Sequence, residues 1–272
     1  MDTLFSVKDK TVVITGGGGV LGGEMAKALA GRGAKVAILD YNLEAAQAVA
    51  SEIVSAGGEA FGVECNVLDR AAVDAATVQC LDVFGQIDIL INGAGGNKRE
   101  ATCVPPESTF FDLDPEAVRW VMDLNCLGTI LPSQAIGQAM ADAGEGVIIN
   151  ISSMNAFRPL TRIAAYSAAK AAVSNFTQWL STYMAQNCSG KIRVNAIAPG
   201  FFLTNQNRFL LTEDDGSLTA RGQQIIDHTP MGRFGESDEL IGTLLWLVTD
   251  AAKFVTGIVV PVDGGFSAYS GV

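Results

Sequence analysis

The chain contains 272 residues, with 18 Lys and Arg against 29 Asp and Glu, so that its formal net charge at pH 7 is -11. Hydrophobic residues make up 49% of the chain and charged residues 17%, a composition that excludes a disordered protein or a coiled coil and is typical of a globular one. The acidic balance also argues against a nucleic-acid partner, because a surface that follows phosphate groups needs local positive charge.

Seven short apolar runs, rich in β-branched residues, predict strands that are buried on both faces of a parallel sheet. These runs lie at 11–15, 35–40, 60–65, 87–92, 146–152, 192–198 and 257–263. Stretches with apolar residues three and four apart predict helices at 21–32, 42–56, 69–84, 115–143, 164–188 and 236–250. The alternation of strands and helices predicts an α/β fold, and since no linker or repeat interrupts it, we expect one domain over residues 1–272.

Two long stretches, at 95–115 and 201–235, interrupt the alternation of predicted strands and helices, and each follows a predicted strand. In an open parallel sheet, ligands bind outside the carboxyl ends of the strands. We therefore expect these two loops to form the walls of a substrate pocket.

The cysteines and the apolar segments of the chain indicate its redox state and its location. The cysteines are odd in number and widely spaced, without a CxxC pair, so we expect reduced thiols and no metal site. The N-terminal segment lacks a basic region followed by a long apolar one, and no apolar run approaches the ~20 residues that a bilayer span needs. We expect a soluble cytoplasmic protein without a membrane partner.

A glycine-rich turn, TGGGGVLG at 15–22, joins the first predicted strand to the first predicted helix. Glycines there permit a tight turn and a close approach of the backbone to a phosphate, although a glycine cluster alone also fits a flexible turn. The next strand ends in Asp40, where a carboxylate accepts hydrogen bonds from an adenosine ribose. Asp40 would repel a 2'-phosphate, and no nearby basic residue offsets that charge, so the predicted cofactor is NAD rather than NADP.

Tyr166 and Lys170 are four residues apart, which places both side chains on one face of the predicted helix 164–188. Such a pair also arises by chance. Ser153 adds weight to it, because this hydroxyl follows the predicted strand 146–152 and emerges at the carboxyl edge of the sheet.

These motifs occur together with others in a fixed order: TGGGGVLG, NGAG at 92–95, Asn125 in LNCLG, Ser153, YSAAK at 166–170, NAIAPG at 195–200 and VDGG at 262–265. In this order and spacing the whole chain resembles the classical short-chain dehydrogenase/reductase family. The resemblance implies a Rossmann fold with a seven-stranded parallel sheet and helices on both faces. It also implies a homo-oligomer, by the family's habit a tetramer.

The resemblance assigns catalytic roles to four residues. Tyr166 would donate the proton in reduction and accept it in oxidation, Ser153 would hold the reacting oxygen, and Lys170 would bind the nicotinamide ribose and lower the pKa of the tyrosine. Asn125 would position a water for proton relay, although a packing amide is the alternative for this residue.

The resemblance further implies a set of cofactor contacts besides Tyr166 and Lys170: Gly16, Gly19, Leu21, Gly22 and Asp40, Asn66 and Val67 at the adenine, Asn92 and Gly93 at the nicotinamide ribose, and Pro199, Gly200 and Thr204 at the carboxamide. Three positions depart from the family pattern. Val20 stands in place of the middle glycine of the turn, NGAG replaces the commoner NNAG, and Asn66 stands where an Asp is usual.

The loops around Ser153 are polar and cationic, with Asn97, Lys98, Arg99, Asn155, Arg158, Arg162, Asn205, Gln206 and Arg208. Amides suit hydroxyl groups and basic side chains suit a carboxylate, whereas a steroid or fatty-acyl pocket would be mostly apolar, and solvated surface charge is the alternative for many of them. The predicted substrate is a small molecule, a sugar acid or polyol, contacted by Asn97, Lys98, Ser153, Asn155, Arg158 and Asn205.

The glycine turn and the loops also resemble those of the D-mannonate oxidoreductases, or fructuronate reductases, within this family, so the favoured activity is NAD-linked interconversion of D-fructuronate and D-mannonate. A 3-oxoacyl carrier-protein reductase and a non-catalytic nucleotide sensor are the alternatives. Asp40 disfavours the first, and the complete set of four catalytic residues disfavours the second. His228 is interpreted as a loop or packing residue.

Overall fold

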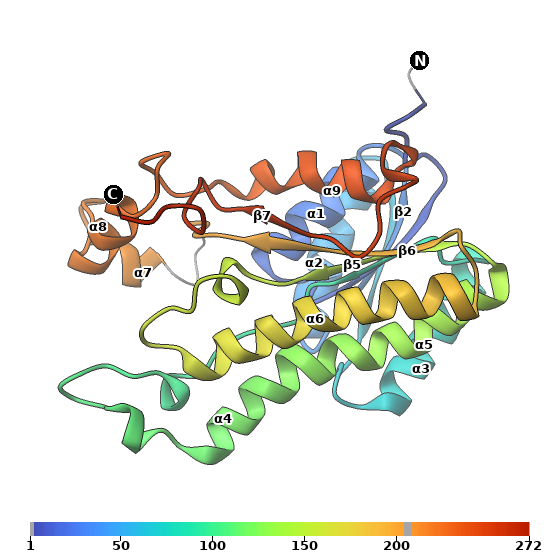
Figure 1. Cartoon of the computed structure of the whole chain (residues 1–272). Coiled ribbons are helices and arrows are strands. Elements are labelled where there is room, and N and C mark those ends of the chain that lie inside the picture. Colours follow the sequence, from blue (N-terminus) through green and yellow to red (C-terminus); the bar gives the residue numbers. More distant parts are fainter. Residues whose placement is uncertain (1–2, 204–207, 272) are drawn as a thin grey trace.

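The computed structural model describes residues 3–203 and 208–271, and its core is one parallel sheet in the order β3-β2-β1-β4-β5-β6-β7. This is the predicted single α/β Rossmann-type domain (Figure 1). The strands are β1 (Thr11–Thr15), β2 (Lys35–Asp40), β3 (Glu59–Glu64), β4 (Ile89–Asn92), β5 (Gly146–Ile151), β6 (Ile192–Pro199) and β7 (Val259–Val262). All seven strands lie within two residues of the predicted bounds, because buried parallel strands are continuous apolar runs that the sequence makes visible.

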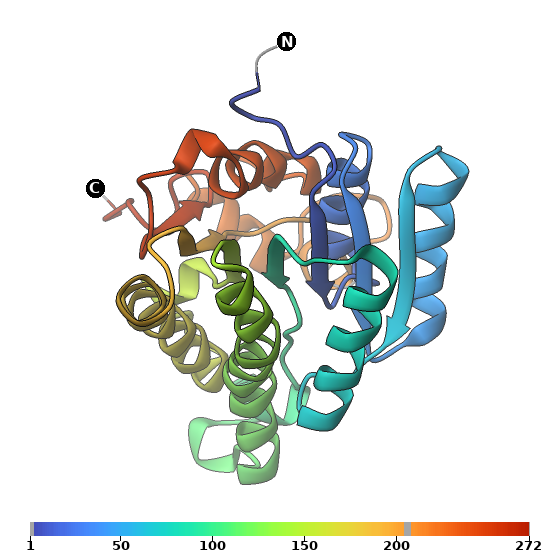
Figure 2. The same cartoon turned by 90° about the vertical axis from the view of Figure 1, so that its right-hand side faces the viewer.

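Helices cover both faces of the sheet, as Figure 2 shows. Their bounds are α1 (Val20–Ala30), α2 (Leu43–Ser55), α3 (Arg70–Phe84), α4 (Pro115–Met122), α5 (Gly128–Ala143), α6 (Ala164–Asn187), α7 (Arg208–Leu211), α8 (Ala220–Asp227) and α9 (Ile241–Val248). Side chains of α1, α2 and α9 pack with one face of the sheet, and those of α3, α5 and α6 pack with the other. None of the helices in the described ranges is long and apolar enough to cross a membrane.

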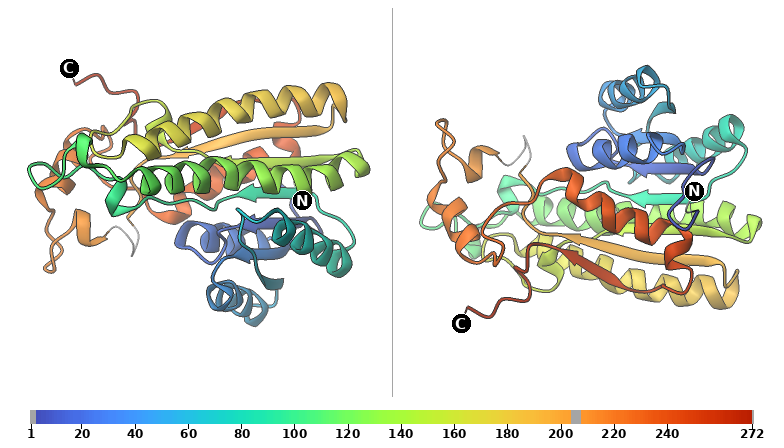
Figure 3. Two further views of the ribbon diagram at one scale, coloured as in Figure 1. Left: turned by 90° about the horizontal axis from the view of Figure 1, so that it is seen from below. Right: turned by 90° about the horizontal axis from the view of Figure 1, so that it is seen from above.

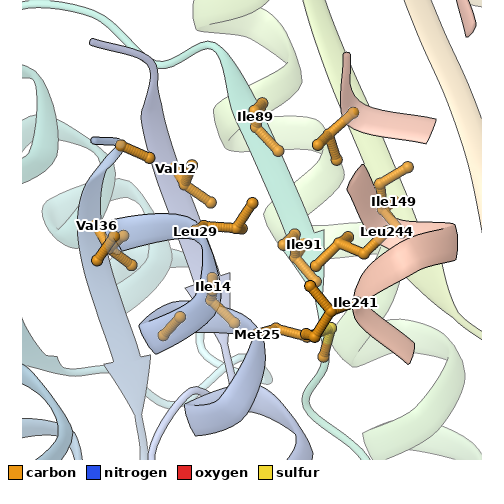
Figure 4. Close-up of a cluster of buried hydrophobic side chains, with 14 of the residues drawn as sticks. Val12, Ile14, Met25, Leu29, Val36, Ile89, Ile91, Ile149, Ile241 and Leu244 are labelled. Atoms are coloured by element: carbon orange, nitrogen blue, oxygen red, sulfur yellow. The ribbon is translucent and has the colours of Figure 1, made fainter. Parts of the chain in front are cut away.

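Two apolar layers, one on each face of the sheet, hold the helices against it. Figure 4 shows one of them, in which Met25 and Leu29 of α1 and Leu244 of α9 meet isoleucines and valines of the sheet. Ile14 and Ile91 in this layer are fully buried. Burial of a side chain of this size stabilises the fold by about 1.5 to 3 kcal/mol, so the strand ends next to these residues are held rigidly.

The predicted helix 115–143 differs from a regular α-helix at one place. A π-helical turn, Asp123–Leu127, separates α4 from α5. The Asn125 side chain lies inside this turn, where its Nδ2 donates to Val121 O at 2.8 Å, and Thr129 Oγ1 donates to Asn125 O at 2.9 Å. Polar side chains that bond to the backbone ladder cause such local widening, which apolar periodicity does not reveal.

The segment 201–235, predicted as a loop, contains the short helices α7 and α8 in its described part. Thr219 caps α8, because its Oγ1 accepts a hydrogen bond from Gly222 N at 3.0 Å. In Figures 1 and 3, α7 and α8 lie beyond the carboxyl ends of the strands. This is the side of the sheet on which the sequence predicts the substrate pocket.

Candidate active site

The site begins where β5 ends and α6 starts. Ser153 follows β5 and is buried, and its side chain is hydrogen-bonded to Tyr166 in the first turn of α6. Lys170 lies one turn further along the same helix, with its Nζ 5.6 Å from the centroid of the Tyr166 ring. Helical spacing on α6 and the position of Ser153 after a strand thus bring the three predicted catalytic groups together.

Lys170 is almost completely buried, with 3% of its surface exposed. Its Nζ donates a 2.7 Å hydrogen bond to Ile151 O at the end of β5. Burial lowers the pKa of Lys170 to about 8, because removal from water disfavours the charged form. The group can therefore gain and lose a proton close to neutral pH.

Burial also raises the pKa of Tyr166 above its ordinary value, and the hydrogen bond with Ser153 opposes this effect without cancelling it. This differs from the expectation that Lys170 lowers the pKa of the tyrosine. The reason is physical: removal of this phenol from water is the larger effect on its pKa. Tyr166 is therefore neutral at pH 7 and able to donate a proton.

Asn125 is fully buried in the π turn and faces the loop that follows β4. Its Nδ2 donates to Gly96 O at 2.7 Å, and its Oδ1 accepts from Gly96 N at 3.2 Å. Gly95 lies against the same amide, since a Cβ atom there would be 2.7 Å from Asn125 Oδ1 and 3.2 Å from Lys170 Nζ. Gly95 thus leaves room for the closest approach between Asn125, Lys170 and the loop after β4.

The glycine turn is shaped for a backbone approach to an anion. Gly16 has a φ of +65°, which favours glycine, and a Cβ at Gly22 would lie 2.4 Å from Gly16 O. No side chain caps the start of α1, and its first turn contains no acid. Val20, which departs from the family pattern, is simply the first residue of α1 and lies outside the positive-φ region. The turn therefore fits a phosphate at the helix N-terminus.

Asp40 ends β2 beside this turn. Its Oδ2 accepts from Gly18 N at 3.0 Å and its Oδ1 accepts from Asn42 N at 2.9 Å. A carboxylate has about four acceptor positions, so room for ribose hydroxyl groups remains. At the next strand end, Asn66 is exposed and Val67 is buried, and Asn66 Oδ1 accepts from Leu68 N at 3.0 Å.

Asn92 at the end of β4 is buried and donates to Ser133 Oγ at 2.9 Å and Asn150 Oδ1 at 2.8 Å. Its Oδ1 has no partner among the described residues, so an acceptor is available for a bound group. Gly93 follows with its N–H bonded to Thr15 O at 3.1 Å, which joins β4 to the glycine turn. After β6, Pro199 is followed by Gly200, where a Cβ would lie 2.6 Å from Asp263 Cα.

The predicted substrate contacts are spread more widely. Asn155 is buried next to Ser153, its N–H donating to Ser153 Oγ at 3.3 Å, and its Oδ1 is unpartnered within the described part of the chain. Asn97 and Arg158 are exposed, and Lys98 Nζ lies 4.3 Å from the centroid of the Trp120 ring. Thr204 and Asn205 lie outside the described residues. The structure thus brings Asn155 to the catalytic group and leaves Asn97 and Arg158 exposed to solvent.

His228, interpreted from the sequence as a loop or packing residue, is exposed at the end of α8. Its ring centroid lies 6.5 Å from that of Phe266.

Sequence reasoning missed two contributors to this site. Gly95 belongs to the NGAG motif, but its contact with Asn125 and Lys170 appears only in three dimensions. The carbonyl of Ile151, which accepts the hydrogen bond of Lys170 Nζ, carries no sequence signal, because any residue offers one.

Comparison with known proteins agrees with this geometry. The model of the short chain dehydrogenase family matches residues 10–215, which is most of the chain. The protein belongs to the short-chain dehydrogenase family. It is therefore a member of a family of oxidoreductases, and the resemblance predicted from its motifs is confirmed.

Several relatives match over nearly the full length. "Uncharacterized oxidoreductase UxuB" of Bacillus subtilis (strain 168) is 49% identical, over 97% of this chain and 96% of the relative. A crystal structure of a "putative D-Mannonate oxidoreductase" of Haemophilus influenzae with bound NAD is 50% identical, covers 98% of both chains and has a TM-score of 0.92. A 3-oxoacyl-[acyl-carrier-protein] reductase of Synechocystis sp. (strain ATCC 27184 / PCC 6803 / Kazusa) is 35% identical over 94% of this chain and 96% of the relative.

Proposed function

We propose that this protein is an NAD(H)-dependent dehydrogenase that interconverts a keto sugar acid and its hydroxy acid, with D-fructuronate and D-mannonate as the favoured pair. The observation that carries the reaction type is the grouping of Ser153, Tyr166 and Lys170 at the carboxyl edge of the sheet. The substrate class is supported by the 50% identical, NAD-bound structure of a "putative D-Mannonate oxidoreductase" and by the polar, cationic loops.

In the direction of reduction, the neutral Tyr166 hydroxyl donates its proton to the carbonyl oxygen of the substrate. Ser153 donates a hydrogen bond to the same oxygen and holds it near the phenol. Lys170, when protonated, stabilises the phenolate that remains. When bound, NADH supplies the hydride that adds to the carbonyl carbon. Oxidation of the hydroxy acid reverses each of these roles.

Asn125 positions the groups around this proton transfer. Its side chain ties the π turn to Gly96 and lies beside Lys170 across Gly95. We propose that it holds a water next to Lys170, so that protons pass between the ammonium group and solvent. Asn155, with its buried unpartnered Oδ1, accepts a hydrogen bond from a substrate hydroxyl in this proposal. Asn97, Lys98, Arg158 and Asn205 are proposed as further substrate contacts.

The residues present fit an NAD molecule. The uncapped N-terminus of α1 and the Gly16, Gly19 and Gly22 turn would hold the phosphates. Asp40 would accept hydrogen bonds from the adenosine ribose and would repel a 2'-phosphate. The contacts predicted at Leu21, Asn66, Val67, Asn92, Gly93, Pro199, Gly200 and Thr204 complete the proposed cofactor site.

A spectrophotometric panel tests cofactor and substrate together. NADH and NADPH oxidation are followed with D-fructuronate, D-tagaturonate, 5-ketogluconate and an acetoacetyl thioester. Turnover of D-fructuronate with NADH supports the proposal. Turnover of the thioester alone would instead favour a 3-oxoacyl carrier-protein reductase, the activity of the 35% identical relative. NADH binding without turnover of any carbonyl compound would favour a nucleotide sensor.

The role of Tyr166 is tested with Tyr166→Phe, which removes the hydroxyl and keeps the ring. We expect turnover to fall by about 10²- to 10⁴-fold while NADH binding persists. Tyr183→Phe is the matched control, because Tyr183 lies on the same helix but is 45% exposed and stacks on Trp179. Equal activity of the two variants would refute the assignment.

We further propose a homo-oligomer, of which a tetramer is the predicted form. Trp179 and Tyr183 stack on the outer face of α6 with ring centroids 5.2 Å apart, and both are largely exposed. Aromatic residues on a surface are typical of interfaces between chains. Light scattering after gel filtration measures the mass directly, and a monomer would refute this proposal.

A further inference from the structure

A network of buried polar side chains lies behind the end of β4, on the face of the sheet that α5 and α6 cover (Figure 1). Asn92 is its centre, because its Nδ2 donates to Ser133 Oγ of α5 at 2.9 Å and to Asn150 Oδ1 of β5 at 2.8 Å. Asn150 is paired with Asn92 in the sheet, and its Nδ2 donates to Thr177 Oγ1 of α6 at 2.9 Å. Each of these four residues has 4% or less of its surface exposed. Side-chain hydrogen bonds thus join two strands and two helices away from bulk water.

The directions of these hydrogen bonds are fixed at both ends by backbone carbonyl groups, which can only accept. Ser133 Oγ donates to the carbonyl one turn earlier in α5 at 2.8 Å, so toward Asn92 it can only accept. Thr177 Oγ1 likewise donates to the carbonyl one turn earlier in α6 at 2.8 Å, so it accepts from Asn150 Nδ2. Asn150 therefore presents its Oδ1 to Asn92. Both neighbours of the Asn92 amide require a donor from it.

This arrangement uses both hydrogens of the Asn92 amide and leaves its Oδ1 outside the network. Asn92 Oδ1 is buried and has no partner among the residues that the structure describes. The chain just after it touches the glycine turn, since a Cβ at Gly16 would lie 2.8 Å from Ala94 N, and Gly93 N donates to Thr15 O at 3.1 Å. A buried acceptor without a donor is unfavourable, so this oxygen fits a bound molecule that supplies the donor.

We propose that Ser133 and Asn150 are positioning residues, which hold the Asn92 amide so that its Oδ1 accepts a hydrogen bond from a hydroxyl group of the bound nicotinamide cofactor. This inference rests on the cofactor site of the function proposed above and names the residues behind that site. With the amide turned over, Asn92 Oδ1 would face two acceptors, Ser133 Oγ and Asn150 Oδ1, which would repel it. The network excludes that orientation, and so prepares the site before the cofactor binds.

The test measures the Kd for NADH by fluorescence titration without any substrate. Ser133→Ala removes one acceptor of the Asn92 amide, and we expect the Kd to rise about 5- to 20-fold. Ser181→Ala is the matched control, because Ser181 is equally buried on α6 and donates to Gln178 O of its own helix at 2.8 Å. Its Oγ lies against Gly257 rather than against β4, so the Kd of this variant should stay within about twofold of the wild-type value.

A double-mutant cycle separates positioning from a general loss of stability. Asn92→Ala alone should weaken NADH binding. Adding Ser133→Ala to it should then change the Kd by less than about twofold, because Ser133 has no amide left to orient. Two losses that multiply would show that Ser133 acts on the fold rather than through Asn92, and would overturn the inference. An unchanged Kd in Ser133→Ala alone would also overturn it.

The other branch of the network gives a test that does not depend on Ser133. Thr177→Val removes the hydroxyl group that fixes the Asn150 amide and keeps the shape of the side chain, whereas Thr177→Ser keeps the hydroxyl group. We expect NADH to bind about 3- to 10-fold more weakly to the Val variant, and within about twofold of the wild-type affinity to the Ser variant. Equal affinities of the two variants would overturn the inference. Urea unfolding without cofactor measures the stability of each variant.

These affinities separate failure of the inference from failure of the proposed function. If the wild type binds NADH but reduces no sugar acid, the substrate proposal fails, and the Kd values still decide the role of the network. If the wild type reduces D-fructuronate and the variants bind NADH as tightly as it does, only the inference about Ser133 and Asn150 fails.

Discussion

Gly95 offers a sharp test of the catalytic geometry, because its neighbour Gly96 provides an internal control. An alanine Cβ at residue 95 would lie 2.7 Å from Asn125 Oδ1 and 3.2 Å from Lys170 Nζ, whereas one at residue 96 would lie 3.7 Å from Leu124 Cδ2, an ordinary contact. Neither glycine has a φ in the left-handed region, so alanine can adopt the backbone conformation at both positions.

The clash in Gly95→Ala must separate the new Cβ and Asn125 Oδ1 by about a further 0.8 Å, since they would lie 2.7 Å apart and carbon and oxygen atoms prefer separations near ~3.5 Å. The amide cannot move freely, because it donates to Gly96 O and Val121 O at 2.7 and 2.8 Å. Distorting one or two such bonds costs about 1 to 2 kcal/mol. A displacement of this size at Asn125 and Lys170 lowers kcat/KM on the order of 10- to 100-fold.

The assay measures kcat/KM for NADH-linked reduction of the best carbonyl substrate, together with the free energy of unfolding in urea. Gly96→Ala should retain activity within about threefold, and both variants should remain folded. If Gly95→Ala were as active as Gly96→Ala, Gly95 would not control the positions of Asn125 and Lys170, and the assigned geometry would be wrong.

Three further predictions concern Lys170, the glycine turn and the cofactor. Because burial lowers the pKa of Lys170 from 10.5 to about 8, the unfolded chain binds more protons between these values, and stability should rise with pH. The free energy of unfolding in urea of the wild type, relative to that of Lys170→Met, should rise by about 2 kcal/mol between about pH 7.5 and about pH 9.5. If the free energies of the two proteins changed in parallel with pH, this prediction would be wrong. Gly22→Ala should destabilise the fold by about 2 kcal/mol or more, measured by unfolding in urea, and should weaken NADH binding, because its Cβ would lie 2.4 Å from the backbone atom Gly16 O. Gly23→Ala is the control, because its Cβ would meet Val49 Cγ2 at 3.3 Å and Gly17 O only at 3.6 Å, so both losses should be much smaller. Asp40→Ser should shift the ratio of kcat/KM from NADH toward NADPH at least about tenfold, and an unchanged ratio would exclude Asp40 from cofactor choice.

The sheet was predictable because each buried strand needs a continuous apolar run. The runs around Ile14 and Ile91 contain little else, and their flanking residues mark where each strand ends. The π turn was not predictable, because apolar spacing continues through residues 115–143 and gives no sign of the widened turn at Asp123–Leu127. Helices α7 and α8 were missed because their segment contains many polar and turn-forming residues.

The candidate site also has features that the sequence predicts and features that it does not. Tyr166 and Lys170 are related by helical periodicity, which the sequence expresses directly. The low pKa of Lys170 is a consequence of burial under several elements, and no residue near it in the sequence indicates that burial. The raised pKa of Tyr166 follows from desolvation for the same reason.

Specificity is the hardest part to predict, because it depends on two irregular segments, 95–115 and 201–235, whose residues share no periodicity. The first is tied to the chain after β5 by the hydrogen bond from Cys103 N to Arg162 O, and within the second Gly222 of α8 lies against Leu211 O at the end of α7. A change in the length or packing of either segment would alter the walls of the proposed substrate site without touching Tyr166. Relatives with the same catalytic residues can therefore act on different substrates.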